Sequence, residues 1–308
     1  MKPFDIQNVL VPVDFSPVAI NALHSAIAIC KRQLATLTLI HVVENTYVLF
    51  PPEAGGAAGV ILPELIVNAN ENMNELTKSL RIKHDIVVKH VVQTGNPADE
   101  ICRWALHKET DLIVMGTHGA SGLREFFLGS NAYRVVKNSP CPVMTIPGTN
   151  QWVDFKEILF PIRMVPHALE KYDMVRPIIR KNGSALLIAG IVKKNDSTGF
   201  VEMKALVDSV KEKFIEDDVI CSSEVMYCED VAKQVLEISK RENPDLIVIT
   251  ATLDKSLKDF FMGPYTQDIV NHAQYPVLSI RPVITRESIK PVETLAGSEI
   301  LSSTIALA

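Results

Sequence analysis

The sequence predicts an α/β protein made of two tandem domains, each an open parallel sheet with helices on both faces. Three observations favour this fold class. Short apolar runs alternate with segments of helical periodicity, and a continuous apolar run is typical of a parallel strand covered on both faces. The second half of the chain repeats the pattern of the first. With 308 residues, the chain is long enough for two domains that each bury a core.

Strands and helices are expected to alternate through the first half. The first helix should follow Ser16-Pro17, a capping residue and a first-turn residue. Helices between successive strands call for right-handed crossovers and hence a parallel sheet. The expected strands are residues 9–13, 37–43, 86–92, 112–115 and 143–146, and further helices are expected around residues 73–80, after Pro97 and after Gly129. Residues 51–59 are rich in Gly and Pro, so a mobile surface loop is expected between residues 44 and 70.

An internal repeat relates the two halves of the chain. Residues 247–280 align without a gap with residues 113–146, and residues 158–162 align with residues 9–13. The predicted domains are therefore residues 1–148 and 152–282, followed by a C-terminal tail at residues 283–308. Because the linker is short and polar, the two copies should pack as a pseudo-dimer. The apolar edge strands ending near Ile146 and Ile280 are expected to pair with each other, and a further homodimer remains open.

Composition limits the classes of function. The net charge is −5, with 22% charged and 47% hydrophobic residues, which is typical of a globular chain and argues against a broad basic surface for nucleic acid. No segment has the pattern of a secretory signal or a membrane span, so the cytoplasm is the expected location. The five cysteines form no C-x-x-C pair and the histidines show no metal-ligand spacing. Reduced thiols and no metal site are expected.

Glycines follow the predicted strand 112–115 in a pattern that favours phosphate binding. Gly116 and Gly119 are separated by two residues, and Gly129-Ser130 comes after nine more. Glycines at the end of a strand let backbone amides approach a ligand without a Cβ atom. Gly129-Ser130 opens a helix pattern, so the free amides and the positive end of the helix dipole would face the same anion. The stretch therefore predicts a nucleotide-phosphate site.

This spacing resembles the ATP-binding branch of the universal stress protein family. Residues 9–14 resemble the family's first strand with its terminal acidic residue, residues 95–98 its Gly-x-Pro turn, and residues 140–143 the entry to its last strand. The resemblance implies two Rossmann-like domains of the adenine nucleotide alpha hydrolase-like type. It also implies ATP, with or without Mg²⁺, as the ligand of the first domain, and a regulatory role with an unknown protein partner.

The predicted nucleotide site gathers residues from the strand ends of the first half. By resemblance, Asp14 would contact the base side of the nucleotide. The alternative is that Asp14, just before Ser16, caps the helix. Val42, with Val43, would form apolar walls for the base. His118 would contact phosphate or be solvated, and Ser130 would bind phosphate or cap its helix. The full predicted set is Pro12, Val13, Asp14, Val42, Met115, Gly116, His118, Gly119, Gly129, Ser130 and Asn131.

The second half departs from the motif at the positions that would bind the nucleotide. Aligned with Asp14, Gly95, Gly116, Gly119 and Ser130 are, in turn, Arg163, Glu229, Thr250, Leu253 and Pro264, and only Gly263 remains. The second half is therefore expected not to bind ATP. A structural or partner-binding role is favoured over a site in which Arg163 and Lys255 hold another anion.

Enzyme chemistry has less support than binding. There is no Walker-type loop, no Ser-His-Asp arrangement that can be placed, and no second acidic residue is expected at a neighbouring strand end. The sequence thus predicts a universal stress protein that binds ATP and acts as a non-enzymatic regulator of the stress response. The alternatives are a nucleotide-free interaction scaffold and a weak ATP-hydrolysing enzyme.

Overall fold

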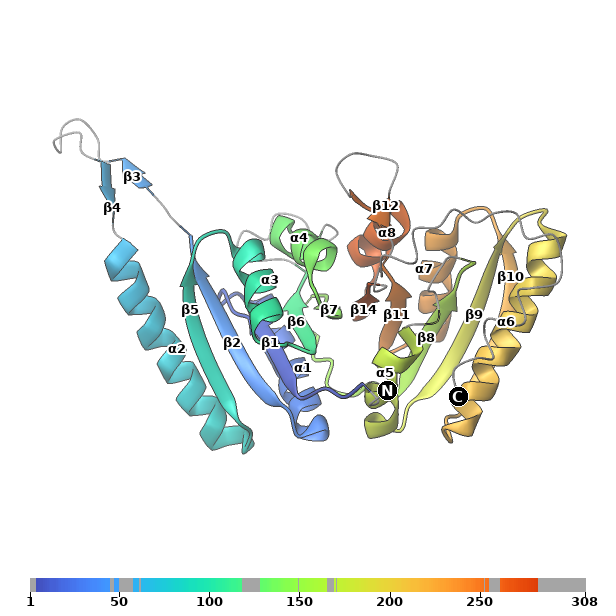
Figure 1. Ribbon diagram of the computed structural model, residues 1–308, viewed down its shortest axis with the longest axis horizontal. Coiled ribbons are helices and arrows are strands. Elements are labelled where there is room, and N and C mark those ends of the chain that lie inside the picture. Colours follow the sequence, from blue (N-terminus) through green and yellow to red (C-terminus); the bar gives the residue numbers. More distant parts are fainter. Residues whose placement is uncertain are drawn as a thin grey trace.

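A computed structural model provides the fold of the chain (Figure 1). It describes residues 4–44, 47–49, 58–60, 62–117, 128–148, 150–164, 169, 171–251, 253–254 and 261–281. The predicted C-terminal tail lies outside the described residues, as do His118 and Gly119.

The first half alternates strands and helices in the predicted order. Its elements are β1 (Asn8–Pro12), α1 (Pro17–Gln33), β2 (Thr36–Val43), α2 (Leu62–His84), β5 (Val88–Thr94), α3 (Pro97–His107), β6 (Leu112–Gly116), α4 (Ser130–Asn138) and β7 (Val143–Ile146). The expectation of one loop between residues 44 and 70 is wrong in part, because α2 already begins at Leu62. Two short strands, β3 (Tyr47–Leu49) and β4 (Ala58–Val60), also pair there, away from the main sheet (Figure 1).

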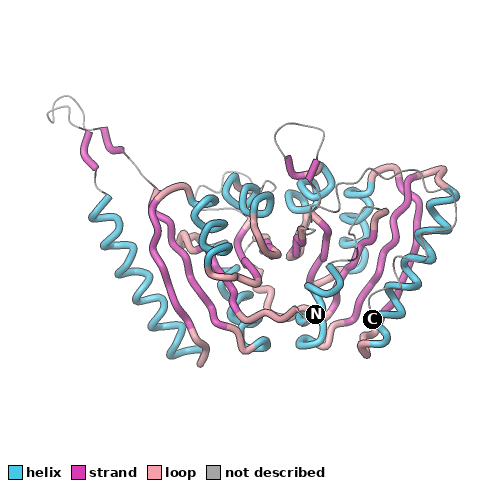
Figure 2. The backbone as a smooth tube through the Cα atoms, in the orientation of Figure 1, coloured by secondary structure: helices cyan, strands magenta, loops and turns pink. Residues whose placement is uncertain are grey.

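The second half repeats this order. Its elements are β8 (Glu157–Ile162), α5 (Lys171–Asn182), β9 (Ala185–Lys193), α6 (Ser197–Glu216), β10 (Cys221–Cys228), α7 (Val231–Glu242), β11 (Leu246–Thr250), α8 (Pro264–His272) and β14 (Val277–Ile280), with the short pair β12 (Leu253–Asp254) and β13 (Phe261–Met262). The registers also match: Asn8 of β1 lies opposite Thr36, as Glu157 of β8 lies opposite Ala185. Figure 2 shows the two halves side by side, each with its strands between helices.

One ten-stranded sheet runs through both halves, in the order β10-β9-β8-β11-β14-β7-β6-β1-β2-β5. Pairing is parallel within each half and antiparallel only between β7 and β14, where Met144 lies opposite Leu278. The predicted pairing of these two strands is confirmed. The halves are therefore joined by backbone hydrogen bonds and not only by packing.

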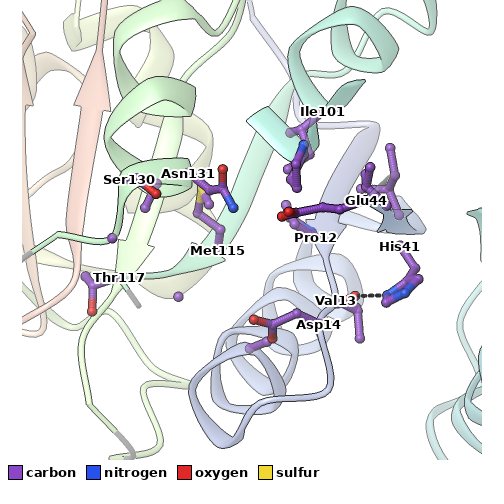
Figure 3. A pocket seen from close by; sticks show the side chains of 17 residues that line it. Pro12, Val13, Asp14, His41, Glu44, Ile101, Met115, Thr117, Ser130 and Asn131 are labelled. Carbon is purple, nitrogen blue, oxygen red and sulfur yellow. Dashed lines mark hydrogen bonds between the residues drawn. The ribbon is translucent and has the colours of Figure 1, made fainter. Parts of the chain in front are cut away.

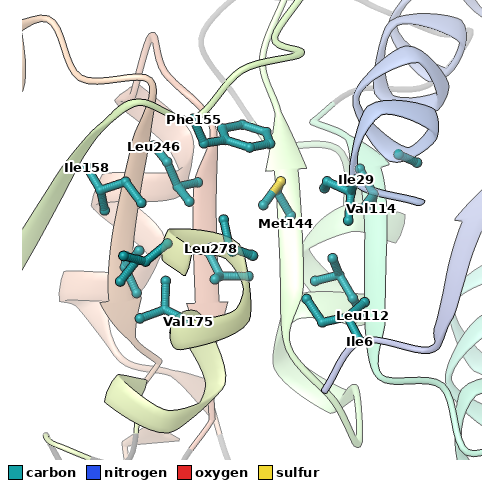
Figure 4. Close-up of a cluster of buried hydrophobic side chains, with 14 of the residues drawn as sticks. Ile6, Ile29, Leu112, Val114, Met144, Phe155, Ile158, Val175, Leu246 and Leu278 are labelled. Atoms are coloured by element: carbon teal, nitrogen blue, oxygen red, sulfur yellow. The ribbon is translucent and has the colours of Figure 1, made fainter. Parts of the chain in front are cut away.

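The core explains why the sheet holds together at this junction. The strands are buried on both faces, so successive residues of β1 enter different clusters: Val9 and Val11 pack under α1, and Leu10 packs under α3 and α4. The cluster on the α1, α2, α5 and α6 side is continuous across the junction, where Met144, Phe155 and Leu278 meet (Figure 4). Helices α3, α4, α7 and α8 cover the opposite face (Figure 1). The strand ends of both halves therefore belong to one continuous sheet.

Candidate functional site

A cleft of about 360 Å³ opens at the carboxyl ends of β1, β2 and β6, beside the first turns of α3 and α4 (Figure 3). This is the place where open parallel sheets bind ligands. The volume lies within the range of small-molecule sites. The cleft is lined by Pro12, Val13, Asp14, Ala19, Ile40, His41, Val42, Glu44, Pro97, Ile101, Met115, Gly116, Thr117, Gly129, Ser130, Asn131 and Ala132.

Nine of the eleven predicted site residues thus lie along one cleft, and the other two, His118 and Gly119, are outside the described residues. Val43, expected beside Val42 as a wall for the base, is buried and is not among the lining residues. Apolar lining comes instead from Ile40, Val42, Ile101 and Met115.

The turn from β1 into α1 positions Asp14. The carboxylate of Asp14 accepts a hydrogen bond from the backbone N–H of Ser16 at 3.0 Å, and the hydroxyl of Ser16 accepts one from the N–H of Ala19 at 3.2 Å. The N-cap of α1 is therefore Ser16, as expected, and the interpretation of Asp14 as that cap is wrong. The bond to Ser16 orients the Asp14 carboxylate at the edge of the cleft.

Phe15 adopts an unusual backbone conformation next to Asp14. Its φ of 61° lies in the left-handed region, which is uncommon for a bulky residue. The Phe15 ring lies 5.4 Å from the ring of His41, and Nδ1 of His41 donates to the carbonyl oxygen of Val13 at 2.6 Å. These contacts hold the end of β1 against β2. Strained residues of this kind cluster at functional sites.

Gly116 is required by packing against α1. A Cβ atom at this position would lie 2.7 Å from Cγ1 of Val18 and 3.2 Å from its backbone carbonyl carbon. The glycine therefore has a structural reason that holds with or without a phosphate. A substitution at Gly116 cannot by itself report on ligand binding.

The first turn of α4 is brought to the cleft by backbone bonds. The N–H of Thr117 donates to the carbonyl oxygen of Ile146 at 3.1 Å, and the N–H of Gly129 donates to the carbonyl oxygen of Thr117 at 2.7 Å. The N-cap of α4 is Gly129, so no side chain caps this helix, and the interpretation of Ser130 as the cap is wrong. The first amides of α4 are thus left for water or an anion.

The second half contributes to this position directly. The N–H of Leu128, which precedes Gly129, donates to Oδ1 of Asn271 at 3.1 Å. Asn271 belongs to α8 of the second half. This bond links the candidate site of one half to a helix of the other.

Several lining residues were not predicted, and Glu44 among them corrects an expectation. Glu44 directly follows Val43, the last residue of β2, and extends into the cleft toward Met115 and Asn131 (Figure 3). The expectation that no second acidic residue stands at a neighbouring strand end is therefore wrong. An acidic residue directly after the apolar run 37–43 was the available signal. The other lining residues that were not predicted are Ala19, Ile40, His41, Pro97, Ile101, Thr117 and Ala132.

The corresponding place in the second half carries two basic residues, of which Arg163 is half-buried and Lys171 is buried. Arg163, at the position of Asp14, donates to the carbonyl oxygen of Thr250 at 3.2 Å and lies 3.5 Å over the Tyr265 ring. Lys171 is fully buried and donates to the carbonyl oxygens of Pro161 at 2.5 Å and Val248 at 3.1 Å. Burial, with Arg163 nearby, lowers the pKa of Lys171 well below its ordinary value. Burial also raises the pKa of Tyr265 to about 12.

Two further searches cover the described part of the chain. None of its helices combines the length and the apolar character needed to cross a membrane. Among the same residues, no group of three or more His, Cys, Asp or Glu is placed to hold a metal ion.

Comparison with protein families and sequences gives consistent matches in both halves. The model of the universal stress protein family matches residues 5–147 and 188–281. The chain is 33% identical over 141 residues to universal stress protein MJ0531 of Methanocaldococcus jannaschii, covering 46% of this chain and 81% of that protein. It is 30% identical over 146 residues to universal stress protein YxiE of Bacillus subtilis, covering 44% of this chain and 96% of that protein.

Solved structures match the arrangement of both halves together. A universal stress protein from Archaeoglobus fulgidus superposes with a TM-score of 0.73 at 18% identity, covering 91% of this chain and 100% of that one. A putative universal stress protein from Pseudomonas aeruginosa superposes with a TM-score of 0.64 at 14% identity, covering 90% of this chain and 94% of that one. The shared fold thus includes the tandem arrangement.

Proposed function

The chain belongs to the universal stress protein family, and from this premise we propose that its first half binds ATP or another adenine nucleotide in the strand-end cleft. In this proposal the protein is a non-enzymatic, cytoplasmic regulator of the stress response. Bound nucleotide would favour one arrangement of the two halves, which a partner protein recognises. A ligand shifts such an equilibrium only through its difference in affinity for the two states.

The observation that carries the proposal is the polarity of the cleft. At one end, α4 begins at Gly129 without a side-chain cap and has no acidic residue in its first turn. Its amides and dipole favour an anion such as a phosphate. At the other end are the carboxylates of Asp14 and Glu44, with the apolar side chains of Val42 and Ile101 nearby. A nucleotide has the same polarity, with an anionic chain at one end and an apolar base with N–H and O–H donors at the other.

Binding without turnover fits the placement of the carboxylates. Asp14 and Glu44 follow the ends of β1 and β2, whereas the anion-binding end of the cleft lies at β6 and α4. A general base for hydrolysis would have to reach the terminal phosphate within hydrogen-bond distance. Mg²⁺ could accompany ATP through its phosphate oxygens and water, as that ion usually does.

The second half serves as a structural partner in this proposal. Arg163 and Lys171 already bond to backbone carbonyls of their own half. Pro264 opens α8, the helix that corresponds to α4, and lacks a backbone N–H. The anion-binding amides of the first half thus have a poorer counterpart here.

The test is thermal unfolding with and without excess ATP, in the presence and absence of Mg²⁺. At about one hundred times its dissociation constant, a ligand that binds only the folded state adds about 2.7 kcal/mol to the free energy of unfolding. The variant is Asn131→Glu, which places a carboxylate in the first turn of α4. This charge suits the helix dipole but repels phosphate. Gln267→Glu adds the same charge in the first turn of α8 and is the matched control.

We expect ATP to raise the midpoint of the parent and the control, and to leave Asn131→Glu nearly unchanged. Nucleotide released from the denatured parent identifies the species that was bound. Intact ATP supports a binding role, whereas release of the diphosphate alone would favour hydrolysis. If no protein shifts and the parent releases no nucleotide, the ATP proposal is wrong and the interaction scaffold becomes the better interpretation.

A further inference from the structure

Glu44 gives the cleft a second carboxylate at the end of β2. Its side chain extends into the cleft in Figure 3, and both it and Asp14 line the cavity while remaining exposed to solvent at its edge. The two residues come from neighbouring strands, because β1 and β2 pair in parallel with Pro12 opposite Ile40. Two carboxylates therefore line the cleft from the ends of neighbouring strands.

The strand order places this pair relative to the anion-binding end. The cleft crosses the strands in the order β6, β1, β2, and neighbouring strands lie about 4.8 Å apart. The end of β2 is thus about 10 Å from the end of β6, measured across two strand spacings. With its phosphates at the start of α4, a nucleotide would lay its ribose and base across the ends of β1 and β2.

Carboxylates at that position discriminate by charge between nucleotides with an unmodified ribose and nucleotides with a phosphorylated ribose. They accept hydrogen bonds from the hydroxyls of an unmodified ribose and from a base amine. A phosphate on the ribose would remove a donor and bring a like charge against both groups. The acidic residue that follows the second strand of dinucleotide-binding folds selects against a 2′-phosphate by the same chemistry.

The second half has the opposite charges at these two positions. In the shared register of β1-β2 and β8-β9, Asp14 corresponds to Arg163 and Glu44 corresponds to Lys193. If Glu44 served only to end the second strand, its charge would not have to be reversed in the second half together with that of Asp14. The acidic pair therefore accompanies the intact glycine motif.

We propose that Glu44, together with Asp14, determines which nucleotides enter the cleft by admitting those with free ribose hydroxyls and excluding those phosphorylated on the ribose. This inference rests on the proposed nucleotide-binding function. It concerns the residue that selects the ligand and not the existence of the site.

The experiment compares AMP with adenosine 3′,5′-bisphosphate, which differ only in the ribose phosphate, by calorimetric titration at low ionic strength. ATP is the reference that reports a working site. The variant is Glu44→Gln, and Glu71→Gln, at an exposed position of α2, is the control for net charge. The parent and the control should bind AMP at least about tenfold more tightly than the bisphosphate. Glu44→Gln should reduce this preference at least about threefold, chiefly by strengthening binding of the bisphosphate.

Because both carboxylates are exposed, added salt should also weaken the preference of the parent. Three results would overturn the inference. If the parent binds both ligands alike, or if Glu44→Gln keeps the parental preference, Glu44 does not select the ligand while the proposed function stands. If the parent binds none of the three nucleotides, the proposed function and this inference are both wrong.

Discussion

Replacing Gly116 with Ala tests why a glycine stands at the end of β6. The new methyl carbon would lie 2.7 Å from Cγ1 of Val18, whereas an ordinary contact begins at 3.4 Å, an intrusion of 0.7 Å. The backbone of α1 at 3.2 Å leaves little room to move aside. Overpacking of this kind costs about 1–3 kcal/mol. We expect Gly116→Ala to lower the free energy of unfolding by that amount, measured by urea denaturation at an unchanged slope.

Val18→Ala removes the atom nearest to the new methyl group. If packing is the cause, the double variant should be more stable than the sum of the single effects predicts, by about 1 kcal/mol or more. Strict additivity, or a Gly116→Ala variant as stable as the parent, would refute the packing argument.

The same pair of variants separates packing from ligand contact. A Cβ atom at Gly116 would meet α1, so we expect the double variant to regain the ATP-dependent rise in midpoint as well as stability. A double variant that is stable but does not respond to ATP would instead show that phosphate must approach the backbone of Gly116 closely. That result would restore the interpretation drawn from the sequence.

Two further predictions concern the second half. The pKa of Lys171 is lowered well below its ordinary value, first by burial and then by Arg163, so below pH about 10.4 the unfolded chain binds more protons than the folded one. The free energy of unfolding should therefore gain a component that rises with pH until the unfolded chain also loses this proton, at about pH 10.4. Lys171→Met should flatten this rise in urea midpoints, and equal pH slopes in parent and variant would contradict the argument. Asn271→Ala removes the acceptor for the N–H of Leu128 and should weaken ATP binding by about 1 kcal/mol, seen as a smaller midpoint shift. Asn271→Asp keeps an acceptor oxygen and should bind ATP more nearly like the parent; an undiminished shift in Asn271→Ala would show that α4 does not depend on this link.

The fold could be predicted from the sequence because its signals are local and repeated. The apolar run at residues 9–13 reports burial on two faces, and Ser16-Pro17 reports the start of a helix. The same signals recur in the second half, which identified the duplication. The pairing of β7 with β14 followed from two apolar edges that would otherwise be exposed.

The candidate site was predictable where a residue type implies a backbone role, and where the family resemblance placed a residue at a strand end or helix start. Gly129 was found because its spacing from Gly116 and Gly119 resembles the family motif, and it is the N-cap of α4. The packing reason for Gly116 could not be predicted, because Val18 becomes its neighbour only when α1 packs on the sheet. The left-handed conformation of Phe15 likewise depends on its contact with His41 and has no signature in residue type. Glu44 was missed although the predicted strand end, Val43, is correct, because residue type does not show whether a side chain just beyond a strand extends into the cleft.

The continuity of the sheet gives the degenerate half a physical role in the site of the other. The segment that leads into α4 is held at Leu128 by Asn271 of α8, and Thr145 of β7 donates its hydroxyl hydrogen bond to Val277 of β14. A movement of α8 would therefore act on the start of α4 through this hydrogen bond. In the second half, Arg163 and Lys171 bond to backbone carbonyls of their own half, so under the proposed function this half supports the start of α4 through contacts that do not involve the nucleotide.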